Sequence, residues 1–251
     1  HILEIEPVDP AFEYNFADKT KITFPNLSLK GICDSIESVL GKAAGDEWHN
    51  LMQRAEHMWD ASRTPFVESE LKSIGSLIAK KGFLADLRVI APLLSLRKLT
   101  SQYTKNPYLS KIVDRYATYS GSDPRKVPAV LLTIAFVESS FGAWHIKGGI
   151  GQLAVALEAR CRELGVKFEL NSPVTKIEHD SKIATGVTVG NQTHRADFVV
   201  ANADAEIVYN KLLSADLQVV KSERKKLAGS TKSLAGFSLL LGLNNNKLSG
   251  P

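Results

Sequence analysis

The sequence predicts a mixed fold, α+β with an α/β part, from the order of three patterns. Strand-type alternation occurs near both ends, at residues 2–24 and 234–243, and amphipathic helical patterns lie within residues 29–137. A glycine turn, a helix and a meander then lead to a continuous apolar run at residues 197–204, which is typical of a strand buried in a parallel sheet. Helices should therefore cap a sheet formed by the two ends, and an incomplete α/β region should follow them.

At 251 residues and 44% hydrophobic content, the chain can bury a substantial core and is long enough for one large or two ordinary domains. The sequence shows neither a basic segment followed by an apolar one at its start nor a membrane-length apolar run, so we expect neither secretion nor a membrane span. Cys33 and Cys161 have no C-x-x-C partner and are expected to be buried thiols of a cytosolic protein.

The first half of the chain predicts strands followed by helices. Residues 2–24 suit three strands with a turn at residues 17–19. The apolar residues of 29–40 share one helical face, with Ser28 as candidate N-cap and Gly41 as the end of the helix.

A second helix is expected over residues 46–62, where tryptophan, methionine and leucine form an apolar stripe. Such a stripe is more typical of a core than of a ligand site. His49 and His57 have no second ligand at metal-binding spacing, so no metal site is expected.

Positive charge is concentrated in residues 71–112, which carry eight Lys or Arg against one Asp, while the whole chain has a net charge of +4. Apolar residues lie between these charges, a composition typical of basic amphipathic helices on anionic membrane surfaces. The solvated face of a helical domain explains the pattern equally well. The modest total charge and the lack of a recognisable motif argue against a nucleic-acid partner. The basic residues are Lys72, Lys80, Lys81, Arg88, Arg97, Lys98, Lys105 and Lys111.

A glycine turn lies between a helix predicted over residues 129–137 and another predicted over residues 150–164. Gly148, Gly149 and Gly151 can take positive φ values and let a flat ligand approach their peptide N–H groups. The start of a helix adds donors without intrahelical partners. A plain tight turn is the more common meaning of this local pattern, because the glycines do not complete a G-x-G-x-x-G motif.

The helix after the glycine turn is followed by strand patterns. Residues 166–170 alternate at strand period and end in a turn at 171–173. Strands at 174–180, 185–189 and 193–196 are separated by short turns, which predicts a small antiparallel meander. The apolar run that follows ends in small and polar residues, and ligands of parallel sheets bind at such carboxyl ends.

Several of these segments together match a known pattern. The matching residues are Val8-Asp9-Pro10-Ala11-Phe12, Phe16-Ala17-Asp18-Lys19-Thr20, Pro124, Pro128-Ala129, Glu138, Phe141-Gly142-Ala143-Trp144, Lys147-Gly148-Gly149, Gly151, Leu153, Glu163-Leu164-Gly165-Val166, Asn171-Ser172-Pro173-Val174-Thr175-Lys176-Ile177 and Ala196-Asp197-Phe198-Val199-Val200-Ala201-Asn202-Ala203-Asp204. In this order they resemble the phytoene desaturase-like flavoproteins of the amine-oxidase group, which include carotenoid desaturases, carotenoid isomerases and retinol saturases.

The resemblance implies a helix-capped substrate-domain sheet and an incomplete Rossmann-type FAD-binding domain. It divides the chain into a substrate-binding domain at 1–146, a partial FAD-binding domain with the meander at 147–213, and a return to the substrate domain at 214–251. The family's first G-x-G-x-x-G turn and its last flavin segment are not in this sequence. We therefore expect an internal piece that by itself holds FAD weakly and is inactive, because a Rossmann half without its phosphate turn loses most of its anion contacts.

The resemblance also assigns roles to individual residues. Gly148 and Gly149 would lie beside the isoalloxazine ring of FAD, and Val174 at its adenine end. Glu138 is a candidate general base, which would require burial to raise its pKa; a structural hydrogen bond is the alternative. The full set is Gly148, Gly149, Gly151, Val174, Ala201, Asn202, Ala203 and Asp204 for the cofactor, and Trp144 and Phe141 for the substrate.

The function implied is FAD-dependent dehydrogenation of a long polyene, with hydride passing from an allylic C–H to the flavin. Such chemistry needs an apolar passage more than a catalytic triad. A carotenoid isomerase, a retinol saturase-like flavoprotein and a flavin-free lipid-binding or scaffold protein stay open as alternatives. The expected location is cytoplasmic and peripheral to a membrane, with residues 71–112 on the lipid surface.

Overall fold

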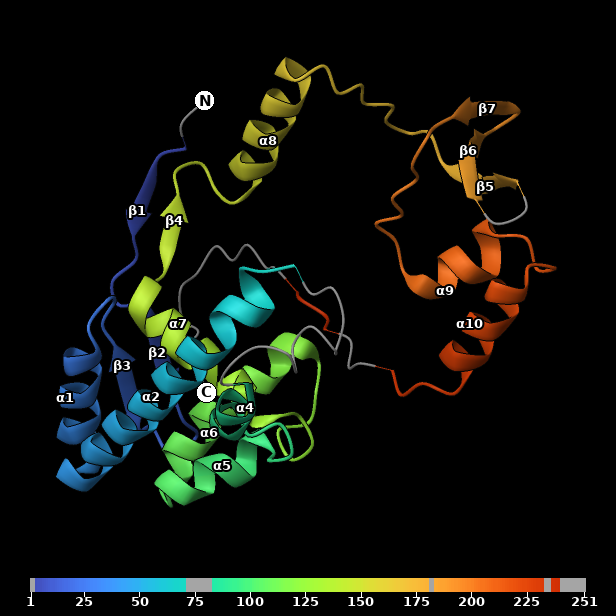
Figure 1. Ribbon diagram of the computed structural model, residues 1–251. Coiled ribbons are helices and arrows are strands. Elements are labelled where there is room, and N and C mark those ends of the chain that lie inside the picture. Colours follow the sequence, from blue (N-terminus) through green and yellow to red (C-terminus); the bar gives the residue numbers. More distant parts are fainter. Residues whose placement is uncertain (1–2, 71–82, 181–182, 233–235, 240–251) are drawn as a thin grey trace. The chain divides into compact units, whose positions relative to one another are not determined.

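A computed structural model describes residues 3–70, 83–180, 183–232 and 236–239. The chain forms two compact units (Figure 1). Unit 1 runs to Leu157 and includes the residues after Lys232, and unit 2 runs from Glu158 to Lys232. The predicted mixture of helices with small sheets is confirmed.

Unit 1 contains two small antiparallel sheets. The strands β2 and β3 form a hairpin whose turn contains Lys19 at φ 69°, and the Phe16 N–H donates to the Thr20 carbonyl at 2.9 Å. The strand β1 pairs instead with β4, which comes from the far end of the helical region, and Figure 1 shows these two side by side. The three predicted N-terminal strands are confirmed, whereas β4 was not predicted. The bounds are β1 (Ile5–Pro7), β2 (Phe12–Asn15), β3 (Lys21–Phe24) and β4 (Trp144–Ile146).

The helices of unit 1 begin and end at recognisable signals. The Ser28 hydroxyl accepts the Gly31 N–H at 3.0 Å at the start of α1, and Gly41 ends that helix at φ 90°. Asn106 caps α6, which has a proline in its first turn. The helices are α1 (Leu29–Leu40), α2 (Lys42–Ser62), η1 (Arg63–Val67), α4 (Phe83–Ile90), α5 (Leu96–Tyr103), α6 (Pro107–Asp114), η2 (Arg115–Ser120), η3 (Ala129–Leu132) and α7 (Thr133–Phe141). The predicted helices over 29–40, 46–62 and 129–137 are confirmed, the last two with longer bounds.

The core of unit 1 lies where α1 and α2 pack on the β2–β3 hairpin. Phe24 of β3 meets Trp48 of α2 edge to face, with ring centroids 5.2 Å apart. The tryptophan and methionine stripe of α2 is buried, as its spacing predicted. Full burial of one such side chain stabilises the fold by about 1.5–3 kcal/mol. Burial of the whole set therefore contributes to the stability of unit 1. Its largest fully buried side chains are Trp48, Tyr116, Ile22, Ile36, Leu51, Met52, Met58, Leu96, Leu109, Ile112, Leu132 and Val113.

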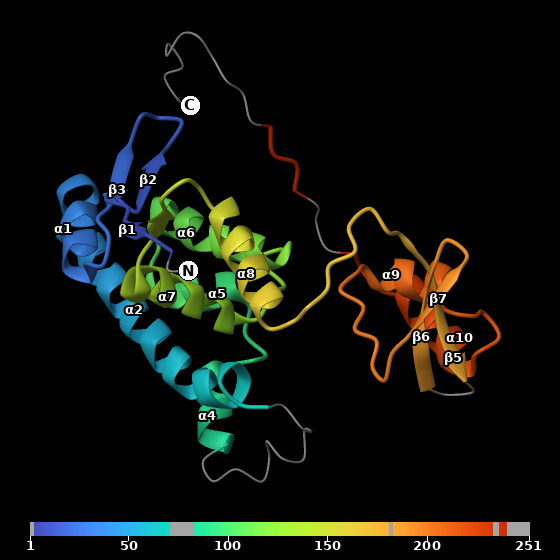
Figure 2. The same ribbon diagram turned by 90° about the horizontal axis from the view of Figure 1, so that it is seen from above.

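Unit 2 consists of an antiparallel meander and short helices (Figure 2). The predicted meander is confirmed, although β6 begins at Ile183, within the expected turn. The Asp204 carboxylate caps α9 by accepting the Glu206 N–H at 2.7 Å. Arg224 of α10 donates to the Tyr209 carbonyl at 2.7 Å. The elements are β5 (Val174–Asp180), β6 (Ile183–Val189), β7 (Gln192–Arg195), α9 (Ala205–Ile207), η4 (Val208–Leu212) and α10 (Gln218–Ala228). The helix α8 (Gly151–Glu163) crosses from unit 1 into unit 2.

Two predicted strands of unit 2 are not formed. Residues 166–170 and 197–204 have no strand pairing, and Phe198 and Val200 are 89% and 92% exposed. A strand is stable only beside a partner that accepts and donates its backbone hydrogen bonds. The described residues supply no such partner for these segments, so their apolar patterns alone do not make them strands.

The C-terminal strand predicted over residues 234–243 is described only at residues 236–239. These four residues are exposed and are not in a strand. The rest of that segment lies outside the described residues. The expected pairing with the N-terminal strands is therefore not seen in the part of the chain that the structure describes.

The compact units differ from the domain bounds predicted at residues 146 and 213. Pairing of β4 with β1 keeps the glycine turn in unit 1, and α10 belongs to unit 2. The predicted assignment of substrate-binding and FAD-binding roles to these regions stays a prediction.

Candidate functional site

A two-way hydrogen bond fixes the segment that precedes the glycine turn. The Asn26 side-chain N–H donates to the Ala143 carbonyl at 2.8 Å, and the Ala143 N–H donates to Asn26 Oδ1 at 2.9 Å. The Asn26 backbone N–H in turn donates to Asp9 Oδ1 at 2.8 Å. Because all three residues come from different parts of unit 1, this clamp positions the end of α7 against the β3–α1 connection.

Gly142 is required at the clamp by both space and backbone conformation. Its φ of 74° and ψ of 173° lie in a region that is essentially restricted to glycine. A Cβ at this position would lie 2.7 Å from Leu27 Cδ2 and 2.8 Å from Asn26 Oδ1. The glycine therefore permits the close approach that the clamp needs.

The predicted glycine turn has the expected conformation. Gly148 and Gly149 have φ values of 84° and 90°, and α8 begins at Gly151. A Cβ built on Gly149 would meet no described atom within 4 Å, so space is open on the side where a side chain would be. The Gly149 N–H donates to the Ile146 carbonyl at 2.7 Å, and the Gln152 and Leu153 N–H groups donate to the Gly149 and Ile150 carbonyls at 3.0 and 3.1 Å. The turn therefore offers space free of side chains, while these three donors are already paired.

Exposed aromatic side chains adjoin the turn. Trp144 and Phe141 are 48% and 51% exposed, and the Trp144 indole N–H donates to the Phe141 carbonyl at 2.7 Å. The Phe141 ring packs edge to face on Trp59, with centroids 6.1 Å apart. The two predicted substrate residues therefore lie together on an apolar surface, here called the aromatic face, made by Trp59, Phe141 and Trp144.

Glu138 is held in an ion pair. Its side chain is 15% exposed, and its carboxylate accepts Arg115 Nη2 at 2.7 Å and the Tyr119 hydroxyl at 2.5 Å. This is the structural hydrogen bond that the sequence left open as the alternative. The carboxylate therefore has two structural partners, and its role as general base stays a prediction.

Aromatic rings surround the partner of Glu138. The Arg115 guanidinium carbon lies 4.8 Å from the ring centroid of Phe12 and 4.6 Å from that of Tyr116. Burial lowers the pKa of Arg115, but the net change is a rise, to which the hydrogen bond and the negative charge of Glu138 contribute. Burial also raises the pKa of Tyr116 well above its usual value. The arginine therefore stays charged and the phenol stays neutral at all ordinary pH values.

The predicted nucleotide-binding residues Val174, Ala201, Asn202, Ala203 and Asp204 belong to unit 2, whereas Gly148, Gly149 and Gly151 belong to unit 1. Val174 opens β5 and is exposed. Residues 201–204 are exposed and do not follow a strand, which corrects the prediction that they lie at the carboxyl end of one. The physical reason is again the missing strand partner.

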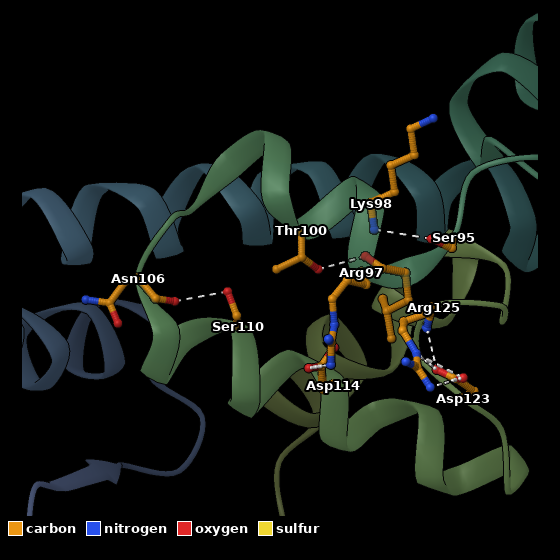
Figure 3. A network of polar contacts seen from close by, with 10 residues as sticks. Ser95, Arg97, Lys98, Thr100, Asn106, Ser110, Asp114, Asp123 and Arg125 are labelled. Atoms are coloured by element: carbon orange, nitrogen blue, oxygen red, sulfur yellow. Dashed lines mark hydrogen bonds and ion pairs between the residues drawn. The ribbon is translucent and has the colours of Figure 1, made fainter.

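In the described part of the basic segment at 71–112, the helices are amphipathic, but their apolar side chains mostly pack into the core instead of facing outward. Leu93, in the connection between α4 and α5, is fully exposed. Arg97 is turned toward the Asp114 carboxylate and forms an ion pair with it, whereas Lys98 extends away from this network (Figure 3). Lys72, Lys80 and Lys81 lie outside the described residues. The buried apolar residues are Ile90, Leu96, Leu99, Leu109 and Ile112.

Sequence analysis missed Asn26, Arg115 and Tyr119. Asn26 follows the strand β3, and its partner Ala143 lies 117 positions along the chain, so no local pattern connects the two residues. Arg115 and Tyr119 lie in η2, and nothing in their spacing along the sequence points to Glu138. The signal available in the sequence was Glu138, a carboxylate on the following helix, because a partly buried acid usually has a cationic partner.

Comparison with known protein families identifies the class of protein to which the chain belongs. Residues 39–237 match the family described as flavin containing amine oxidoreductase, and the chain belongs to this family. Membership indicates FAD as the cofactor.

Three relatives show which members of this family the chain resembles. The chain is 29% identical to 1-hydroxycarotenoid 3,4-desaturase of Flavobacterium sp. (strain P99-3), over 90% of this chain and 45% of the relative. It is 28% identical to hydroxyneurosporene desaturase of Rubrivivax gelatinosus, over 88% and 42%. It is 24% identical to 4,4'-diapolycopene oxygenase of Methylomonas sp, over 96% and 48%. The predicted resemblance is confirmed, and the chain spans about half the length of the curated relatives it matches.

Within the described ranges, no helix is both long enough and apolar enough to cross a bilayer. Across the same ranges, His, Cys, Asp and Glu form no group of three that suits a metal ion.

Proposed function

We propose that the protein to which this chain belongs is an FAD-dependent oxidoreductase that dehydrogenates a long polyene. The observation that carries the proposal is the aromatic face beside the open glycine turn in a member of a flavin-containing family. Relatives named as carotenoid desaturases support a polyene as substrate. FAD, when bound, supplies a group that accepts hydride from an allylic C–H.

The residues of this chain bind the polyene and the flavin and orient them toward each other. A conjugated hydrocarbon gains contact area on the rings of Trp144 and Phe141 without requiring a polar partner. The hydrogen bond from the Trp144 indole to the Phe141 carbonyl holds the indole in place, and the Asn26 clamp fixes the backbone beside it. Peptide groups at Gly148 and Gly149 offer a surface without side chains to the flavin edge. Together they would set the distance between the substrate chain and the cofactor.

Two glycine variants at positions of equal φ test this proposal. Gly149 and Gly41 both have φ 90° and both have open space where a Cβ would be. In the enzyme at the full length of its relatives, Gly149→Val should lose most polyene turnover, while Gly41→Val should keep it at a similar melting temperature. Loss only at Gly149 would mean that a group outside the described chain occupies that space. Equal turnover in both variants would overturn the proposal.

The products distinguish the reactions that related proteins perform. Chromatography of the products should show a polyene with an added double bond. An unchanged formula with altered double-bond geometry would indicate isomerisation, and an added oxygen would indicate the reaction named for the Methylomonas relative.

We propose also that unit 2 forms part of a Rossmann-type FAD-binding domain. The meander and the family match support this assignment. Val174→Asp would place a charge at the expected adenine end and should lower the flavin absorbance per protein. Thr175→Asp, at the neighbouring exposed position of β5, is the matched control. Equal flavin content in the two variants would remove Val174 from the site.

We propose further that residues 71–112 dock the enzyme on an anionic membrane that stores its substrate. The described residues that support this are Leu93, which is fully exposed, and the cations Arg88 and Lys98. Each basic residue near an anionic surface contributes about 1 kcal/mol. Arg97 is a poor probe because it already pairs with Asp114.

Vesicle sedimentation tests the docking proposal. The protein should bind anionic vesicles at low salt and dissociate at high salt. The double variant Arg88→Gln, Lys98→Gln should weaken binding more than Lys221→Gln, Lys225→Gln, which removes the same charge from α10. Equal binding to neutral vesicles would contradict the proposal.

A further inference from the structure

A polar pocket opens on the surface of unit 1 between α2 and α5. Its volume is about 380 Å³, and small-molecule sites commonly measure about 300–1,000 Å³. Four of its residues come from one face of α2, at positions i, i+3, i+4 and i+7, and two come from the end of α5. The lining residues are Asn50, Gln53, Arg54, His57, Gln102 and Tyr103.

Arg54 is the charged centre of this pocket. The residue is partly buried, and its Nη2 donates to the Val89 carbonyl at the end of α4. This contact holds the guanidinium in place, while Nε and Nη1 have no protein acceptor in the part of the chain that the structure describes. A guanidinium carries five N–H donors in a planar fork, so most of its donors can turn to a ligand.

Arg54 also has no counter-charge on the protein. It forms no ion pair within the described ranges, and neither Asp nor Glu lines the pocket. A partly buried cation is normally paired with an anion, because the protein surroundings solvate its charge less well than water does. Other arginines of the chain follow this rule. Those that pair with a carboxylate are Arg63, Arg97, Arg115, Arg125, Arg160 and Arg162.

The other lining side chains add neutral hydrogen-bonding groups around the cation. They are three amides, an imidazole and a phenol, and none has a hydrogen-bond partner among the described residues. An arginine fork surrounded by neutral donors suits the oxygens of a phosphate group, which it can bind through two parallel hydrogen bonds. The pocket is larger than a bare phosphate ion, so it also has room for the organic part of a phosphate ester.

We propose that this pocket binds a phosphate ester, with Arg54 on the phosphate and the amides of α2 and α5 on the polar group attached to it. The proposal goes beyond the proposed oxidoreductase reaction and does not depend on it. A soluble phosphate ester and the headgroup of a phospholipid share this chemistry. The lipid source would connect the pocket with the proposed docking segment, because the fully exposed Leu93 follows Val89 closely in the chain.

Calorimetric titration of the full-length enzyme with glycerol 3-phosphate tests the proposal. Gln102→Glu changes an exposed residue and places a negative charge in the pocket, so it should weaken binding by about tenfold or more. Gln218→Glu makes the same change at an exposed position of α10 outside the pocket and should leave binding unchanged. Arg54→Gln should abolish measurable binding. Gln102→Glu decides the question by itself if loss of the contact with Val89 unfolds the Arg54 variant.

Vesicles that contain phosphatidic acid distinguish the two sources. Binding of glycerol 3-phosphate that Gln102→Glu weakens would support a soluble ester. Binding only to the vesicles, weaker in Gln102→Glu than in Gln218→Glu, would support a lipid headgroup. The proposal would be overturned if the wild-type enzyme bound neither probe, or if Gln102→Glu and Gln218→Glu bound both probes equally well.

Discussion

Unit 1 and unit 2 bury their apolar residues to very different degrees. Unit 1 has a continuous core that connects the β2–β3 hairpin with α1, α2, α5, α6 and α7. In the described part of unit 2, Ile177 and Val220 are the buried hydrophobic residues, while Leu164, Leu170 and Phe198 are exposed. The same apolar periodicity therefore forms a core in one unit and an exposed surface in the other. A strand or helix pattern thus needs a complementary layer before its apolar side chains can be buried.

The largest expected effect compares a buried leucine with an exposed one. Leu51→Ala should lower the free energy of unfolding by about 2–5 kcal/mol, because it leaves a cavity in the core of unit 1. Leu170→Ala in unit 2 should change it by less than about 0.5 kcal/mol. Urea unfolding followed by circular dichroism measures both, and tryptophan fluorescence reports on unit 1, which contains Trp48, Trp59 and Trp144. Similar losses in the two variants would mean that unit 2 also has a core of its own.

The next effect compares two glycines of unit 1. Gly142→Ala adds a methyl group 2.7 Å from Leu27 Cδ2, whereas Gly41→Ala meets nothing within 4 Å. Both glycines have backbone angles that an L-residue adopts at a cost of about 1–3 kcal/mol. Gly142→Ala should therefore cost about 2 kcal/mol more than Gly41→Ala in urea unfolding, from overpacking at the clamp. Equal losses in the free energy of unfolding would show that the residues of the clamp can move to accommodate the methyl group without a cost.

A smaller effect compares ion pairs of the two units. Glu138→Gln leaves the half-buried Arg115 without its counter-charge and should cost on the order of 2 kcal/mol. Glu158→Gln breaks the pair with Arg162 on α8, where both side chains are about half exposed, and should cost at most about 0.5 kcal/mol. Thermal unfolding of both variants measures the difference. If Glu138→Gln keeps its stability but loses turnover, the carboxylate is a base and not a structural partner.

The smallest effect concerns an exposed acid at the surface of unit 1. Hydrogen bonds from the Arg125 side chain and backbone lower the pKa of Asp123 from 3.8 to about 2 (Figure 3). A depressed pKa means that the pair contributes stability above the unfolded value, and that this contribution is lost as the pH falls toward 2. An NMR titration should place the Asp123 midpoint near 2, and Arg125→Gln should move it upward. A midpoint near 3.8 in both proteins would show that the pair does not form.

Local structure was predictable wherever the signal and its partner are close in sequence. The cap at Ser28, the end of α1 at Gly41 and the antiparallel meander all follow from neighbouring residues. The positive φ values of Gly148 and Gly149 were expected for the same reason. The apolar stripe of α2 also predicted its buried face correctly, because a 3.6-residue period fixes which side chains point the same way.

The sequence by itself determined the class of the protein, its helices and the residues of the glycine turn. Only the tertiary structure decided that β1 pairs with β4, that Asn26 clamps Ala143, and that Glu138 meets Arg115 and Tyr119. It also decided that residues 197–204 are not a strand. The physical reason is that each of these depends on a partner far along the chain or on a sheet neighbour, and a local pattern contains no information about whether that partner is present.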